Sequence, residues 1–216
     1  MLNDLIDMPV NSLLNGCWEK EDYYIQKING RDICHESWKE MKPKSRDRIT
    51  KDYFEEYYNK IHKNKGLSHI PKEVSSQWLY PFNDDINSLA NYAWIDFYKA
   101  YFSLEEIDVD IFISQVHPNN EGRDLVTTRA RCKDFSHFCC FDKDIEYWKE
   151  QGTWRVPPVI LDSSSFSNIP EWADINYPYQ LIEGHNRLGY LHANYNMKNR
   201  NLKNKHQVYI LKDAKI

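Results

Sequence analysis

The sequence predicts an α+β protein with a mostly helical first half, residues 1–103, and a second half, residues 104–216, in which strands and helices alternate. Two observations support this prediction. Apolar and aromatic residues recur at helical spacing through residues 83–101, whereas short apolar runs alternate with helix-like segments in the second half. No glycine- or serine-rich linker separates the halves, so we expect them to pack together as one body.

Two helices are expected in the first half, after an irregular stretch of about 48 residues with short helical pieces. One spans residues 50–65, with Thr50 as its cap and Gly66 as its stop. The other starts near Asn83. Its expected buried stripe comprises Ile86, Leu89, Ala90, Ala93, Trp94, Phe97, Tyr98 and Tyr101. Between them, the segment "SSQWLYPF" is expected to form an exposed loop.

The second half begins with "IDVDIFI", residues 107–113, whose alternation predicts a half-buried strand. Its expected buried face comprises Ile107, Val109, Ile111 and Ile113, opposite Asp108, Asp110 and Phe112. The segment "SQVHPNNEGRD" is expected to be a loop, and residues 125–141 fit no element. A helix over "DKDIEYWKEQG", capped by Asp142 and stopped by Gly152, then precedes a buried strand in "PPVILD". "YQLI" predicts the next strand, "HNRLGYLHANY" the next helix and "HQVYIL" the last strand.

Composition and charge narrow the class of protein. Apolar residues make up 41% of the 216 residues and charged residues 28%, as in ordinary globular domains. No apolar run approaches the ~20 residues that span a bilayer, and the first ten residues lack a signal-peptide pattern. We therefore expect a cytoplasmic protein without a membrane segment.

The net charge of −4 argues against a dedicated nucleic-acid-binding protein, because such proteins are usually basic. One local exception is the segment "NMKNRNLKNKH", which contains bases but no acid. Its basic residues are Lys198, Arg200, Lys203, Lys205 and His206. A solvated loop and a nucleic-acid contact both remain open for this segment.

The five cysteines do not resemble a disulfide framework, since their number is odd and their spacing is scattered. The cluster "CKDFSHFCC" combines Cys132, His137, Cys139 and Cys140, all of which are potential zinc ligands. It lacks the paired C-x-x-C arrangement of zinc knuckles. We expect reduced thiols, with zinc as the alternative.

The most distinctive stretch is Glu183-Gly184-His185-Asn186-Arg187, at a predicted strand-to-helix corner. The first N–H groups of a helix lack intrahelical partners and attract anions, phosphate above all. Gly184 lets a ligand approach the backbone, and Arg187 can bind phosphate oxygens in a bidentate manner. Glu183 is unfavourable beside an anion unless it binds a metal ion or takes a proton. A simple Glu183–Arg187 ion pair is the alternative.

The stretch "YQLIEGHNRLGYL" resembles the ParB/sulfiredoxin superfamily, whose members carry a strand, a Gly-x-x-Arg loop that binds nucleotide phosphates, and a helix. Two further stretches fit in the expected order. "DIFISQVHPNN" is similar to the family's opening strand and Pro-Asn loop, and "IEYWKEQGTWRVPPVIL" to its helix, glycine stop and proline-initiated strand. The resemblance covers roughly residues 107–211 and implies a mixed sheet with helices.

Departures from the family pattern narrow the expected activity. The loop has no cysteine before Arg187, which argues against sulfinic-acid reduction. The sequence after Arg187 is too short for the helix-turn-helix region of partition proteins, so we expect no centromere clamp. The loop is most similar to Asp-Gly-His-x-Arg of the free serine kinase branch, with Glu183 in place of the aspartate.

That resemblance implies nucleotide-dependent phosphoryl transfer to a small hydroxyl compound, or nucleotide hydrolysis, with ATP, ADP or CTP and Mg²⁺ as cofactors. The implied catalytic residues are Glu183, His185 and Glu121, with Glu121 as the base and Glu183 also as the metal ligand. The implied nucleotide-binding residues are Gly184, His185, Asn186, Arg187 and Arg123.

Two other functions remain open. One is a non-catalytic module that binds a protein partner through the helical first half, for which the "SSQWLYPF" segment is the motive. The other is a ParB-like nuclease, which only the basic segment after residue 197 favours.

Overall fold

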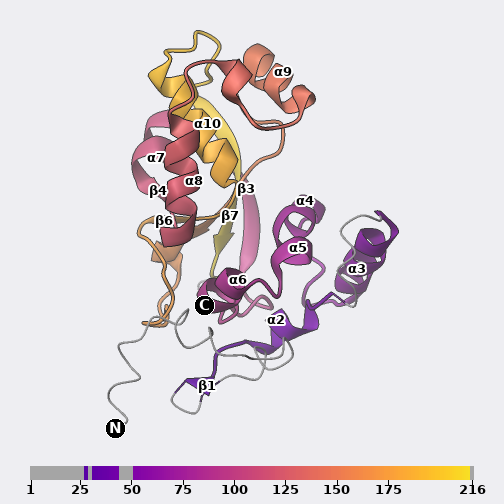
Figure 1. Cartoon of the computed structure of the whole chain (residues 1–216). Helices are drawn as coiled ribbons and strands as arrows, with labels where there is room; N and C mark the ends of the chain where they lie inside the picture. Colours follow the sequence, from indigo (N-terminus) through magenta and orange to yellow (C-terminus); the bar gives the residue numbers. More distant parts are fainter. Residues whose placement is uncertain (1–26, 29–30, 44–50, 215–216) are drawn as a thin grey trace. The chain divides into compact units, whose positions relative to one another are not determined.

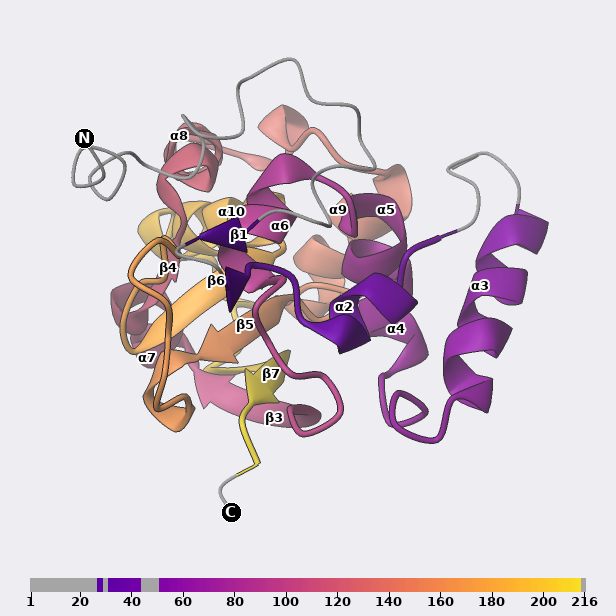
Figure 2. The ribbon, with the colours of Figure 1, turned by 90° about the horizontal axis from the view of Figure 1, so that it is seen from below.

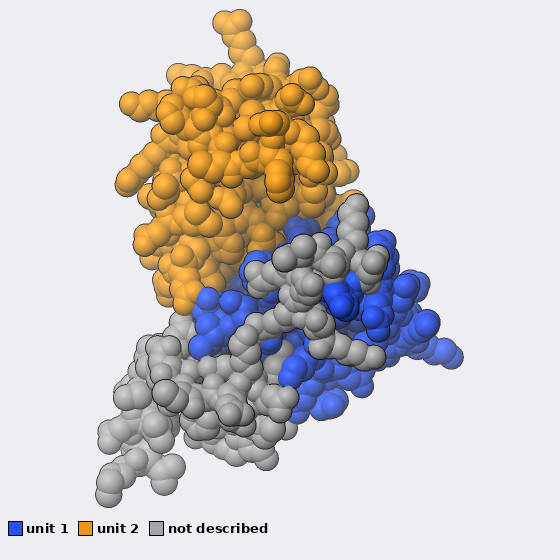
Figure 3. Space-filling view, turned by 45° about the vertical axis from the view of Figure 1, so that its right-hand side comes forward, with its two compact units in different colours: residues 1–101, 168–175, 213–216 blue, residues 102–167, 176–212 orange. Residues whose placement is uncertain are grey.

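The computed structural model describes residues 27–28, 31–43 and 51–214, and the chain divides into two compact units (Figure 3). Unit 1 comprises residues 1–101, 168–175 and 213–216, and unit 2 comprises residues 102–167 and 176–212. The sequence predicts one boundary, after residue 103. The return of segment 168–175 to unit 1 was not expected, and the packing of the two halves as one body stays a prediction.

Unit 2 is built on a five-stranded sheet with the order β3-β7-β5-β6-β4 (Figure 1). The strands are β3 (Tyr101–Asp108), β4 (Val116–Pro118), β5 (Val159–Asp162), β6 (Tyr179–Glu183) and β7 (Lys205–Lys212). Strand β6 is parallel to β4 and antiparallel to β5, and β5 is parallel to β7. The predicted α+β class, with a mixed sheet and a helical N-terminal region, is confirmed.

Four helices connect these strands: α7 (Val109–Gln115), α8 (Asn120–Ala130), α9 (Asp142–Gln151) and α10 (His185–Asn196). Figure 2 shows α8 and α10 side by side against the sheet. The core between helices and sheet includes Val126, Leu188, Leu191, Ile160, Leu181 and Val208. Burial of each such side chain stabilises the fold by roughly 1.5–3 kcal/mol. The paired position of α8 and α10 is therefore fixed by the core.

Several predicted elements of the second half are confirmed. Helix α9 ends at Gly152, whose φ of 60° lies in the left-handed region that glycine adopts readily. The strands expected in "PPVILD", "YQLI" and "HQVYIL" are β5, β6 and β7, and the helix after the corner is α10. Asp142 is the first residue of α9 and not its cap, which is Phe141.

Two predictions for residues 107–124 are wrong. The alternating segment 107–113 is not a strand, because β3 ends at Asp108 and helix α7 follows. Phe112 is fully buried in that helix, whereas Ile111, expected on the buried face, is 37% exposed. The expected loop "SQVHPNNEGRD" contains strand β4 and the first turns of α8. Asn119 starts this helix by accepting the Gly122 N–H at 2.8 Å.

Unit 1 contains mostly short helices, shown in Figure 1. They are α2 (Glu36–Glu40), α3 (Lys51–Lys63), α4 (Lys72–Val74), the π-helical turn η3 (Ser75–Leu79), α5 (Tyr80–Phe82) and α6 (Ile86–Tyr92). Two short antiparallel strands precede them, β1 (Lys27–Ile28) and β2 (Arg31–Asp32). Helix α3 confirms the helix expected over residues 50–65. Its expected cap, Thr50, and most of the irregular stretch before residue 48 lie outside the described residues.

The second expected helix of unit 1 is much shorter than predicted. Helix α6 ends at Tyr92, because Asp96 then organises a turn by accepting the N–H of Tyr98 and of Ala100. Phe97 is still buried, but Tyr98 and Tyr101 are exposed. The expected exposed loop "SSQWLYPF" is helical, with Trp78 and Leu79 buried, so it offers no exposed aromatic segment.

No helix in the described part of the chain is both long and apolar enough to cross a membrane.

Candidate functional site

The predicted corner lies at an edge of the unit 2 sheet where two helices begin. Strand β4 pairs in parallel with β6, with Val116 opposite Tyr179 and Pro118 opposite Leu181. Each strand is followed at once by a helix, α8 after β4 and α10 after β6. Because parallel strands end at the same edge of a sheet, the N-termini of α8 and α10 lie at that edge together.

The two helices approach each other closely because each presents a glycine to the other. An ideal Cβ on Gly122 of α8 would lie 2.1 Å from Cδ2 of His185 on α10. An ideal Cβ on Gly189 of α10 would lie 2.4 Å from Cβ of Arg129 on α8. His185, the first residue of α10, therefore faces the first turn of α8, and Gly189, further along α10, faces Arg129 near the end of α8, so the helices run in the same general direction. Their dipoles place two positive ends side by side.

The two N-termini differ in how their N–H groups are satisfied. Helix α8 has a side-chain cap, Asn119, which accepts the Gly122 N–H. Helix α10 follows Gly184, whose φ of 114° is left-handed and whose lack of a side chain leaves no capping group. The first N–H groups of α10 are therefore positioned to donate hydrogen bonds to an external acceptor.

Glu183 and Arg187 hold this corner together. Arg187 Nη1 donates to the carbonyl of Val156 at 2.9 Å and to that of Pro157 at 3.4 Å, and Nη2 lies 3.5 Å from Glu183 Oε1. Burial raises the pKa of Glu183 and lowers the pKa of Arg187, and the attraction between the two charges offsets only part of either shift. Arg187 thus ties the segment before β5 to the corner, and the ion pair expected as an alternative is present.

His185 is the first residue of α10, and its ring is packed against Gly122. Its Nε2 atom is buried and has no hydrogen-bond partner within the described structure. Burial, reinforced by the Arg187 charge, lowers the pKa of His185 to about 4. The imidazole is therefore neutral near pH 7, and a buried neutral ring nitrogen without a partner is a group that a ligand can satisfy.

Asn186, the second residue of α10, is exposed and oriented by α8. Arg129 Nε donates to its Oδ1 at 2.9 Å. Because the amide oxygen is occupied by this donor, the amide N–H₂ is directed elsewhere and can donate to a ligand. Arg129 thereby fixes both the position and the polarity of a side chain at the N-terminus of α10.

Glu121 and Arg123 flank Gly122 in the first turns of α8, and both are exposed. Because Gly122 touches His185, these two residues lie at the same end of unit 2 as the corner. An acid in the first turn also stabilises the helix dipole, which is a sufficient structural reason for Glu121. The structure thus brings all seven sequence-predicted site residues to one edge of unit 2.

Three residues of this edge were not expected: Asn119, Gly122 and Arg129. Asn119 as a cap, followed by Glu121 in the first turn, is a sequence pattern that predicts the start of a helix at α8. The contacts of Gly122 with His185 and of Arg129 with Asn186 join residues 63 and 57 positions apart in this sequence. No local pattern indicates such contacts.

The described residues contain no group of three or more His, Cys, Asp or Glu side chains arranged to hold a metal ion. Magnesium often uses one or two carboxylates and takes its other ligands from phosphate and water. Glu183 could supply one such carboxylate ligand, provided that its contact with Arg187 opens. The Cys132–Cys140 segment likewise forms no such group in the described structure.

Comparison of the chain with protein-family models, with curated proteins and with solved structures finds no match.

The basic segment after residue 197 is not a uniform basic surface. Lys198, Arg200, Lys203 and Lys205 are exposed, but His206 is only 1% exposed. Its Nδ1 lies 2.8 Å from Thr153 Oγ1, and burial lowers its pKa to about 4. His206 is therefore an uncharged core residue, which weakens the motive for a nucleic-acid contact.

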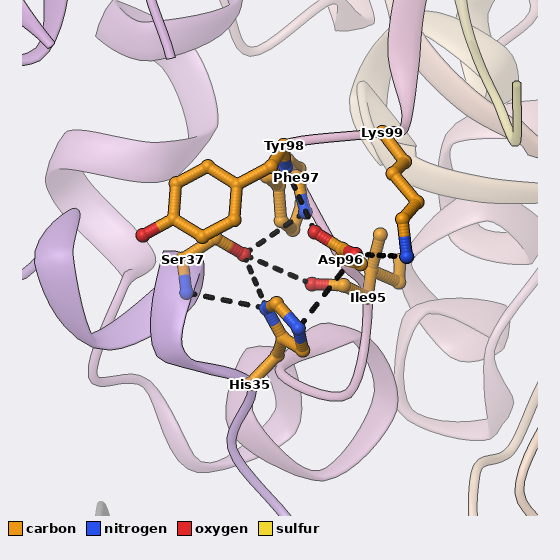
Figure 4. A network of polar contacts seen from close by, with 7 residues as sticks. All are labelled: His35, Ser37, Ile95, Asp96, Phe97, Tyr98 and Lys99. Atoms are coloured by element: carbon orange, nitrogen blue, oxygen red, sulfur yellow. Dashed lines mark hydrogen bonds and ion pairs between the residues drawn. The ribbon is translucent and has the colours of Figure 1, made fainter. Parts of the chain in front are cut away.

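Unit 1 contains a second polar network, which includes Ser37, His35 and Asp96 (Figure 4). Ser37 Oγ lies 2.8 Å from His35 Nδ1, and His35 Nε2 lies 3.8 Å from Asp96 Oδ2. The order of groups is that of a nucleophile, a base and an acid, but Ser37 is fully buried. Its Oγ also accepts the Phe97 N–H at 2.9 Å, and the His35 side chain caps α2 by accepting the Ser37 N–H. This network is structural.

Proposed function

We propose that the paired N-termini of α8 and α10 bind a phosphate group of a nucleotide, or of a related phosphorylated compound, as a step in phosphoryl transfer to a small hydroxyl compound or to water. One observation carries the proposal. Two parallel helices begin side by side, and α10 begins after Gly184 without a side-chain cap. Two positive helix ends, with first-turn N–H groups that have no intrahelical partner, favour an anion over a neutral ligand.

The side chains at this edge supply complementary donors. The Asn186 amide donates N–H groups because Arg129 occupies its oxygen. The neutral His185 ring offers a buried Nε2 that donates or accepts one hydrogen bond according to its tautomer. Arg187 has a positioning role in this proposal. Its hydrogen bonds to the carbonyls of Val156 and Pro157 hold in place the segment against which Gly184 packs.

The position of Glu183 is the reason to expect a metal ion or a proton transfer at this site. Its carboxyl group lies beside the same N-terminus, where it repels a phosphate when charged. Glu183 would hold a magnesium ion that arrives with a nucleotide, and the ion would supply neutralisation of the phosphate charge. Burial raises the pKa of Glu183, so that this carboxyl also takes up a proton more readily than an exposed one. Glu121, exposed on the first turn of α8, is the group assigned to accept a hydroxyl proton in this proposal.

Calorimetric titration of the full chain with ATP, ADP, CTP and inorganic phosphate, each with and without Mg²⁺, tests the binding step. Asn186→Asp adds a negative charge at the N-terminus of α10 and is expected to weaken binding at least tenfold. Asn196→Asp makes the same chemical change at the exposed last residue of α10 and is the matched control. Absence of binding to the wild-type chain by all four ligands contradicts the proposal.

The transfer step has its own test. The wild-type chain is incubated with the nucleotide that binds most tightly and with a set of small alcohols, and phosphorus NMR follows new phosphate esters and free phosphate. Glu183→Gln and Glu121→Gln are expected to lower the rate of either product. Binding without any product under all conditions would reduce the proposal to phosphate binding alone.

A further inference from the structure

Three thiols, those of Cys132, Cys139 and Cys140, surround the short turn that connects α8 to α9. The turn itself is a 3-10 helix, Phe135–His137. Cys132 follows Arg131, the C-cap of α8, and Cys139 follows Phe138, the C-cap of the turn. Two of the three thiols therefore flank the turn from opposite sides.

Both flanking thiols are directed to the same atom. Cys132 Sγ lies 3.4 Å and Cys139 Sγ 3.8 Å from the carbonyl oxygen of His137. Two sulfur atoms that contact one oxygen lie within side-chain rotation of each other. Neither residue belongs to a helix or a strand, so a small change in backbone angles breaks no ladder of hydrogen bonds.

The third thiol is less suited to reaction. Cys132 and Cys140 both pack against the core of unit 2, but among the described contacts of this segment the thiols that approach the shared oxygen are those of Cys132 and Cys139. Burial raises the pKa of Cys132, and burial together with the nearby Asp144 charge raises the pKa of Cys140 to about 11, so the thiolate of Cys140 is strongly suppressed. Cys139 is exposed, whereas Cys132 is half-buried. Accessibility therefore favours Cys139 as the thiol that an oxidant meets first.

We propose that Cys132 and Cys139 are a reversible dithiol–disulfide pair, oxidised by a low-molecular-weight disulfide such as oxidised glutathione. The Cys139 thiolate attacks one glutathione sulfur, and the S–S bond of glutathione breaks to release one glutathione thiolate. The Cys132 thiolate then attacks the Cys139 sulfur and releases the second glutathione. Two protein thiols are oxidised, one glutathione disulfide is reduced to two thiols, and the two protein protons are taken up by them.

The disulfide removes both S–H contacts with His137 and joins the end of α8 to the segment before α9. It requires an S–S bond of about 2.05 Å, so the turn between the two cysteines must tighten. The inference does not depend on the phosphate site.

The experiment oxidises the folded, reduced full chain at graded ratios of oxidised to reduced glutathione and then blocks remaining thiols with iodoacetamide. Trypsin cleaves after Arg131, Lys133 and Lys143, so Cys132 is released on a different peptide from Cys139 and Cys140. A disulfide therefore appears as two linked peptides in the mass spectrum. Cys132→Ser and Cys139→Ser remove the pair, and Cys140→Ser is the matched control. Circular dichroism verifies that each variant is folded.

We expect the two linked peptides in the wild-type chain and in Cys140→Ser. Their combined mass should be two hydrogens below that of the two reduced peptides, and the two linked cysteines should carry no alkyl group. Dithiothreitol should reverse the link, and neither Cys132→Ser nor Cys139→Ser should form it. Linked peptides that persist in Cys139→Ser would assign the reaction to Cys140 and overturn the proposal. The proposal also fails if the wild-type chain forms the link only after unfolding in urea, or at no ratio.

Discussion

The imidazole of His185 occupies the space that any side chain at position 122 would need. An ideal Cβ on Gly122 would lie 2.1 Å from Cδ2 and 2.2 Å from Nε2 of that ring. This contact brings the first turn of α8 against the first residue of α10. It also buries Nε2, and burial keeps the ring neutral. The geometry of the proposed phosphate site depends on this contact.

Gly122→Ala should displace the His185 ring and weaken phosphate binding. The added methyl group cannot fit without movement of the ring or of the helix, and overpacking of this kind costs about 1–3 kcal/mol. We expect a loss of that size in urea unfolding and at least a tenfold weaker affinity for the best ligand. Thr127→Ala, at an exposed position of the same helix, is the control. Unchanged binding in a folded Gly122→Ala variant would show that the contact is not part of the site.

Glu183→Gln should change the metal dependence of ligand binding. It removes a negative charge beside the N-terminus of α10 and retains the shape of the side chain. We expect metal-free binding of ATP or phosphate to strengthen by about tenfold, because a nearby like charge at protein surfaces costs on the order of 1 kcal/mol. Mg²⁺ should then add little affinity. If the wild-type chain and the variant respond equally to Mg²⁺, Glu183 is not the metal ligand.

Arg187→Ala should destabilise unit 2 as well as the site. The change leaves the Val156 carbonyl and the Glu183 carboxyl without their cationic partner, and the loss of a charged hydrogen bond costs about 1.5–3 kcal/mol. Urea unfolding followed by tryptophan fluorescence measures the difference. Arg187→Lys keeps the charge but not the two-armed geometry, so we expect an intermediate stability. Equal stability of Arg187→Ala and the wild type would contradict the anchoring role of Arg187.

Stability should fall in acid through His206. Burial holds the pKa of His206 at about 4 in the folded chain, below its ordinary value of 6.5. Between these two values the unfolded chain binds a proton that the folded chain does not, so stability rises with pH across this window and is lost as pH falls through it. The full effect is about 3 kcal/mol.

Urea unfolding at several pH values between about 4 and 7.5 measures that slope in the wild type and in His206→Gln. The variant should be less stable at neutral pH but should lose less stability on acidification. His185, whose pKa burial also lowers to about 4, contributes in the same direction and in the same window. A slope unchanged by His206→Gln would show that His206 does not titrate as proposed.

Local sequence determined most elements of the second half, because each had a strong local signal. Gly152 ends α9 through a backbone angle that favours glycine, and apolar runs form β5, β6 and β7 because both faces or one face of each is buried. The corner Glu183–Arg187 could be located for the same reason. A strand and a helix meet there, and the glycine between them has a left-handed angle.

Local sequence failed where two periods were compatible with the same residues. In residues 107–113 apolar residues recur at every second position, but Val109, Phe112 and Ile113 also have helical spacing. Strand β3 already occupies residues 101–108, and burial of Phe112 at the core then favours helix α7. In α8 only Val126 is buried, so its hydrophobic pattern was too weak to indicate a helix. Its Asn119 cap was the remaining signal.

The sequence by itself determined that a glycine-containing, charged corner follows a buried strand and starts a helix. Only the tertiary structure decided what surrounds that corner. The parallel pairing of β4 with β6 places α8 beside α10, Gly122 admits the His185 ring, and Arg129 orients Asn186. It also directs Arg187 to the carbonyls of Val156 and Pro157. These contacts join residues far apart in the chain, and they form only because burial of the apolar faces of both helices against one sheet fixes their alignment.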